Sequence, residues 1–92
     1  MEKQRIEFRL YDMANPVIWD KFEEYALNLI DKGWSKYGSK GIMEVVRYHI
    51  QLNGVPIKIN NNYTPDYARK FVEKYPQHKG FFEFRNLKRV KR

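Results

Sequence analysis

The chain contains no cysteine, so its 92 residues depend on one apolar core for stability. Disulfides and thiolate metal sites are excluded at once. A chain this short buries only about 60–65% of its unfolded surface, which excludes two-domain enzymes and large cofactor cradles. Seven Tyr, six Phe and two Trp supply much of the bulk that a core needs. We therefore expect a single domain over residues 1–87, followed by a basic tail at residues 88–92.

Positive charge is concentrated in the later part of the chain. The formal net charge is +7. Residues 1–15 are neutral, residues 16–32 carry −2, and residues 33–92 carry +9. Four cations lie within the last five residues. This balance favours a polyanionic partner, although basic termini also serve solubility alone.

Three segments show the helical spacing of apolar residues, with start and stop signals at their ends. We expect helices over residues 16–32, 39–52 and 64–75. Asn15 and Thr64 are good N-cap residues, and each precedes a proline suited to a first turn. Gly33 and Gly54 are suited to end the first two helices.

Three shorter segments have the composition of strands. Residues 5–10 alternate polar and apolar side chains, although an extended arm shows the same alternation. Residues 55–59 contain Pro56, which restricts them to a short or edge strand. Residues 81–84 form the third. The expected order is β-α-α-β-α-β, an α+β domain with a two- or three-stranded antiparallel sheet and winged-helix-like architecture.

The sequence gives little support for catalysis. His49 and His78 are far apart and lack the spacing of a metal site. His49 lies on an apolar stripe, where a hydrogen-bonded core histidine is expected, whereas His78 is expected in a loop. Pro65-Asp66 followed by Glu83-Phe84-Arg85 faintly resembles a metal-dependent nuclease layout, but Arg is no substitute for a lysine that must lose a proton. We expect no enzyme activity, no metal and no cofactor.

The third helix and the Asn-rich turn before it are the best candidates for a nucleic-acid interface. Backbone N–H groups at a helix start bind phosphate, and Asn and Arg side chains read base edges. An alternative is a capped amphipathic helix with solvated charges, Arg69 being partly engaged by Glu73. A Glu44–Arg47 pair is also expected. The candidate contacts are Lys58, Asn60, Asn61, Asn62, Tyr63, Thr64, Arg69, Lys70, Lys74, Lys79, Lys88, Arg89, Lys91 and Arg92.

Several stretches together resemble a family of small uncharacterised phage and prophage proteins. The main one is Ile-Lys-Ile-Asn-Asn-Asn-Tyr-Thr-Pro-Asp-Tyr-Ala-Arg at residues 57–69. It is supported by residues 14–16, 42–47, 73–76 and 80–85, so the resemblance covers about residues 14–88. It implies a phage or mobile-element origin, where small basic proteins bind DNA, regulate transcription or inhibit host defence. The family has no assigned activity, so no functional residue is carried over.

Charge, candidate helix and resemblance together predict a non-enzymatic nucleic-acid-binding protein, in first place a double-stranded DNA binder with a helix-turn-helix role in regulation. The alternative is a small inhibitor that binds a host nuclease or defence complex, as anti-CRISPR proteins do. RNA binding without DNA is a third, weaker option. No apolar run is long enough to span a membrane, and we expect a cytoplasmic location in a bacterial host. The sequence does not specify an oligomeric state.

Overall fold

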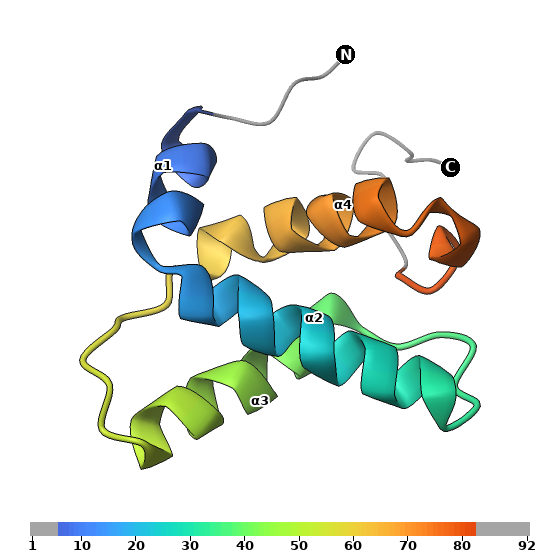
Figure 1. Ribbon diagram of the computed structural model, residues 1–92, viewed down its shortest axis with the longest axis horizontal. Coiled ribbons are helices and arrows are strands. Elements are labelled where there is room, and N and C mark those ends of the chain that lie inside the picture. Colours follow the sequence, from blue (N-terminus) through green and yellow to red (C-terminus); the bar gives the residue numbers. More distant parts are fainter. Residues whose placement is uncertain (1–5, 83–92) are drawn as a thin grey trace, which may run out of the picture.

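The structure is a computed structural model that describes residues 6–82, and four α-helices make up most of it (Figure 1). The elements are α1 (Ile6–Ala14), α2 (Pro16–Asp31), α3 (Ser39–Leu52), the 3-10 turn η1 (Asn61–Tyr63), α4 (Thr64–Lys74) and the 3-10 turn η2 (Pro76–His78). Helix α2 packs against each of the other three helices, with α4 and α3 on either side of it (Figure 1). None of the described helices is both long and apolar enough to cross a membrane.

The core is built largely of aromatic rings. Phe22 of α2 packs against Tyr67 and Phe82, with ring centroids 5.8 Å and 5.6 Å away. Tyr67 in turn meets Phe8 of α1 edge-on at 4.8 Å, and Phe71 of α4 contacts Phe82 at 5.5 Å. One aromatic cluster therefore joins α1, α2, α4 and the chain after η2, which is how a short cysteine-free chain fills its interior.

The three expected helices are confirmed, with ends that differ by a residue or so. Gly33 and Gly54 both have positive φ (101° and 68°) and end α2 and α3 as expected. Asn15 lies at the start of α2, but its side chain makes no cap hydrogen bond there. Its Nδ2 instead donates to the Tyr11 carbonyl at 3.0 Å, which closes the end of α1. Thr64 is not the N-cap of α4 but its first helical residue, and it is buried.

The predicted α+β, winged-helix-like fold is wrong, because residues 6–82 form no strand. The segment from residue 6 onward is helical. Of its three alternating apolar residues only Phe8 is buried, while Ile6 and Leu10 are exposed. An alternation of polar and apolar residues over only six residues does not exclude a helix, because a helix of this length can bury a single side chain, here Phe8.

The segment at residues 55–59 is not a strand and has no partner strand within residues 6–82. Pro56 lacks an N–H, and the Ile57 N–H donates to the Val55 carbonyl within a tight turn at 2.8 Å. The Tyr11 hydroxyl donates to the Lys58 carbonyl at 2.8 Å and accepts from the Asn60 N–H at 3.2 Å. A single side chain thus pairs with backbone groups that a sheet would otherwise engage.

The last expected strand is also absent where it is described. Phe81 and Phe82 are adjacent, and both are buried (3% exposed each). A strand would send neighbouring side chains to opposite faces, whereas here both rings pack on Phe71. Residues 83 and 84 of that prediction lie outside the described residues, as does the basic tail.

Candidate nucleic-acid interface

Two cations of α4 that the sequence assigned to an interface take part in ion pairs between helices. The Lys70 ammonium pairs with Asp12 at the end of α1 and lies 4.5 Å from the centroid of the Trp19 ring. Lys74 Nζ is 2.6 Å from Glu23 Oε2 of α2. Both lysines therefore help to hold α4 against α1 and α2.

Glu23 also accepts a hydrogen bond from the Tyr75 hydroxyl at 2.5 Å. Burial raises the pKa of Glu23, but the bonds from Lys74 and Tyr75 outweigh burial and leave that pKa below its ordinary value. The same bond to Glu23 raises the pKa of Lys74 and of Tyr75. The charged forms of Glu23 and Lys74 thus stabilise each other.

Arg69 is the most exposed of the three α4 cations. Its Nη1 lies 3.5 Å from Oδ1 of the buried Asp66, one turn earlier on the same helix. The expected pairing with Glu73 is absent between these two described side chains. The predicted pair of Arg47 with Glu44 is confirmed at 2.9 Å.

The residues of the Asn-rich turn, 60–63, form hydrogen bonds and ring contacts within the fold. Asn60 Oδ1 accepts from the Asn62 N–H at 2.9 Å, which caps η1. Asn61 Oδ1 accepts a hydrogen bond from Arg47 of α3. Tyr63 packs on Tyr11, with ring centroids 4.7 Å apart, and Lys58 is exposed nearby. The turn therefore links α1 and α3 to the start of α4.

The remaining predicted contacts lie elsewhere. Lys79 is exposed in the turn after η2. Lys88, Arg89, Lys91 and Arg92 lie outside the described residues. His49 is half-buried, and its Nδ1 is 3.1 Å from the Tyr25 hydroxyl, consistent with the structural role expected of it.

The connection between α2 and α3 carries a different group of basic and aromatic residues. Residues 32–40 include three lysines and no acidic residue. In the part of the chain that the structure describes, Lys32 Nζ has a single long contact of 3.5 Å, to Asn28 Oδ1. Within residues 6–82, Lys36 and Lys40 have no ion pair or hydrogen bond through their ammonium groups, and both are exposed. These lysines therefore remain available to an external anion.

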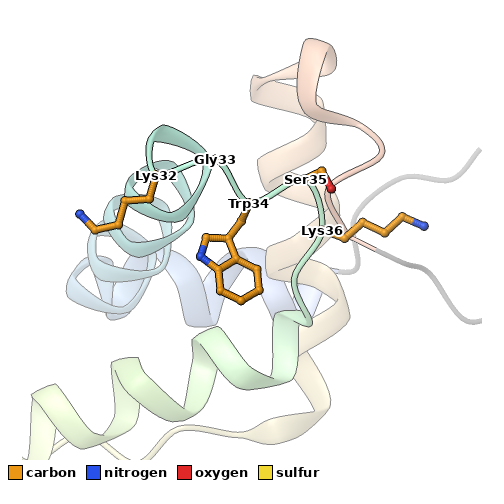
Figure 2. A pocket seen from close by; sticks show the side chains of 5 residues that line it. All are labelled: Lys32, Gly33, Trp34, Ser35 and Lys36. Atoms are coloured by element: carbon orange, nitrogen blue, oxygen red, sulfur yellow. The ribbon is translucent and has the colours of Figure 1, made fainter.

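The end of α2 fixes the position of Trp34 in this connection. The Gly33 N–H donates to the Ile30 carbonyl at 3.0 Å, and the Trp34 N–H donates to the Leu29 carbonyl at 3.1 Å. With Gly33 at positive φ, these two bonds form a Schellman motif. Figure 2 shows the indole of Trp34 between Lys32 and Lys36, whose side chains extend to opposite sides. The three residues line an open hollow with Gly33 and Ser35.

Tyr37, which lies two residues before the start of α3, packs its ring against that of Trp34. The two rings meet at 86° with centroids 5.3 Å apart. Tyr37 itself lies close over Gly41, where an added Cβ would come within 3.2 Å of the Tyr37 ring. Its N–H donates to the Phe81 carbonyl at 3.1 Å, so the turn that carries Lys79 lies beside the connection. We call Lys32, Trp34, Lys36, Lys40 and Lys79 the connector surface.

Residues 34–41 hold two glycines and two serines, a composition that predicts a connector between helices. The usable signal was Lys-Gly-Trp-Ser-Lys-Tyr at residues 32–37, an alternation of basic and aromatic residues. It was outweighed by the glycine and serine content, which is also typical of a plain connector.

None of the family models, curated proteins or solved structures compared with the chain matches it at a significant level. Among residues 6–82, no group of three or more His, Asp and Glu side chains is placed to hold a metal ion.

Proposed function

We propose that the protein binds nucleic acid, with DNA as the expected form, through the connector surface. The observation that carries this proposal is the contrast between two groups of lysines. Lys70 and Lys74 of α4 are neutralised by carboxylates of other helices, whereas Lys36 and Lys40 are exposed and have no acidic partner within residues 6–82. Phosphate binding gains most from cations that need not first give up a partner.

The arrangement of charge supports the same surface. The exposed carboxylates Asp20 and Glu24 lie earlier in α2, whereas the exposed Asp31 is the last residue of that helix and directly precedes Lys32. The turn with Lys79 joins the connector through the Tyr37–Phe81 hydrogen bond and adds no acidic residue between 76 and 82. Lys32, Lys36, Lys40 and Lys79 therefore outnumber Asp31, the exposed carboxylate at this end of α2.

A pair of matched double variants tests the location. Lys36→Ala/Lys40→Ala removes two positive charges from the connector surface, and Arg9→Ala/Lys58→Ala removes two equally exposed charges elsewhere. The first should weaken binding to mixed-sequence DNA and reduce the slope of log K against log [salt] by about 1.8 on a duplex, at roughly 0.9 per lost phosphate contact. The second should leave both quantities nearly unchanged.

A larger loss in Arg9→Ala/Lys58→Ala would instead favour the Asn-rich turn around Lys58. Absence of DNA binding by the unaltered protein at low salt would overturn the proposal. Thermal unfolding of each variant is the control for folding, and little change is expected because none of the four side chains has a partner within residues 6–82.

Two exposed apolar stripes favour a second candidate function, binding to a protein such as a host nuclease or defence complex. Ile6, Leu10 and Met13 follow helical spacing on α1 and are 61–75% exposed. Val45, Tyr48 and Leu52 form a similar stripe on α3. Exposed apolar groups at this spacing suit a protein partner. The phage origin implied by the resemblance fits either function and stays a prediction.

A further inference from the structure

The form of nucleic acid can be inferred from the aromatic residue at the centre of the connector surface. Resting on the proposed nucleic-acid binding, we propose that this surface takes a single strand, with one unpaired base stacked on the indole of Trp34. A duplex presents phosphates and groove edges, since its base faces cover one another. An indole reaches the face of a base only where the strand is unpaired.

The two tryptophans of this chain differ in solvent exposure, and Trp34 is the exposed one. It is 52% exposed, whereas Trp19, the other one, is 8% exposed and packs with Phe22 and Lys70. A tryptophan left half in solvent forgoes much of the stabilisation that burial would give. Here that exposed surface lies between lysines that extend to opposite sides (Figure 2). A stacked nucleotide has a phosphate on its 5′ side and another on its 3′ side, which fits this placement.

The indole is also held in place before any ligand arrives. The Schellman motif fixes the backbone of Trp34, and the ring of Tyr37 contacts the indole. Tyr37 is in turn held by its N–H bond to Phe81 and by close approach to Gly41. A pre-positioned ring loses little conformational freedom on binding, which favours a specific stacking site.

The test compares an unstructured oligothymidine with a mixed-sequence duplex of equal phosphate number, using full-length protein. The variant is Trp34→Ala. Its control is Tyr48→Ala, which removes an aromatic residue that is 63% exposed on α3 outside the connector surface. Fluorescence anisotropy of a labelled strand gives affinity, and intrinsic tryptophan fluorescence reports on stacking. Trp34→Phe gives the residual signal of Trp19 and should retain part of the affinity.

We expect the single strand to bind more tightly than the duplex and to quench the fluorescence of Trp34. Trp34→Ala should lose about 5- to 150-fold in affinity for the single strand, the range for one stacked base, and less than about twofold for the duplex. Tyr48→Ala should change neither affinity by more than about twofold. These effects would be additional to the charge effect of Lys36→Ala/Lys40→Ala.

The proposal is overturned if Trp34→Ala binds the single strand as the unaltered protein does, or if it weakens single strand and duplex equally. Duplex binding that is as tight as single-strand binding, with both depending on Lys36 and Lys40 and neither on Trp34, would overturn the single-strand inference and leave the proposed function standing. If neither nucleic acid binds at low salt, both fail. Circular dichroism of Trp34→Ala checks that the helices are retained.

Discussion

The Tyr67 hydroxyl is a buried polar group without a hydrogen-bond partner among the residues that the structure describes. The side chain is fully buried in the aromatic core, and burial, helped by nearby Asp12, raises the pKa of Tyr67, so the hydroxyl stays neutral. Such a group loses its bonds to water and gains none in return. The ring is essential to the packing, but the oxygen is an energetic cost.

Tyr67→Phe should therefore raise the free energy of unfolding by about 1 kcal/mol. In a domain of this size that corresponds to a rise of roughly 4–8 °C in Tm. The control is Tyr25→Phe, which removes a hydroxyl that is bonded to His49 Nδ1 at 3.1 Å, and which should lose about 0.5–1.5 kcal/mol. Equal losses in both variants would show that the Tyr67 hydroxyl has a partner after all.

At the scale of the element, the contacts of Glu23 link α2 to α4. The folded-state pKa of Glu23 lies below its ordinary value, since the bonds from Lys74 and Tyr75 outweigh burial. A carboxylate of this kind adds stability above its unfolded pKa, near 4.3. That contribution is lost as the pH falls through the folded value. The packing of α4 on α2 should therefore weaken in acid.

Glu23→Gln tests this dependence. At pH 7 the variant should be less stable than the parent in urea unfolding, and at pH 3 the difference should be smaller because a larger fraction of Glu23 in the parent is then protonated. Glu24→Gln is the control, since Glu24 pairs with Lys21 on its own helix and is 59% exposed at the side chain, an arrangement that contributes little. A difference for Glu23→Gln that is the same at both pH values would contradict the assignment.

The helices whose ends are marked by proline or glycine could be predicted from the sequence, whereas the strands expected from hydrophobic pattern alone were wrong. Pro16, Gly33, Gly54 and Pro65 mark ends of α2, α3 and α4, because each restricts or permits specific backbone angles. The strand expected at residues 5–10 has no proline or glycine at either end. Its assignment depended on Ile6 and Leu10 being buried, and both are exposed on α1. Which apolar residues face inward is decided by tertiary packing, which local spacing does not contain.

The candidate site was less predictable than the helices for a related reason. Lys70 and Lys74 look free on α4 alone, but their partners Asp12 and Glu23 lie more than 50 residues earlier in the chain. The sequence shows how many cations exist, and only the fold shows which ones are already paired. Conversely, the sequence places Trp34 only in a connector between helices, and it is the fold that shows the Schellman turn holding it at the surface.

At the scale of the whole molecule, the two candidate functions differ in their dependence on salt. Deleting residues 88–92 removes four cations. If these contact phosphates, the deletion should reduce the slope of log K against log [salt] by up to about 2.8 on a single strand, at roughly 0.7 per contact. It should leave any preference for unpaired bases intact, because that preference is assigned to Trp34. The measurement is a salt titration of full-length and shortened protein.

An inhibitor of a protein complex would behave differently, because its affinity would come from the apolar stripes on α1 and α3. Binding of that kind depends on buried anchors and responds weakly to salt. A binding curve for a protein partner that is unchanged from low to high salt, lost in Leu10→Asp and retained in Lys36→Ala/Lys40→Ala, would support the second function. The reverse pattern, with steep salt dependence and insensitivity to Leu10→Asp, is expected if the connector surface binds nucleic acid.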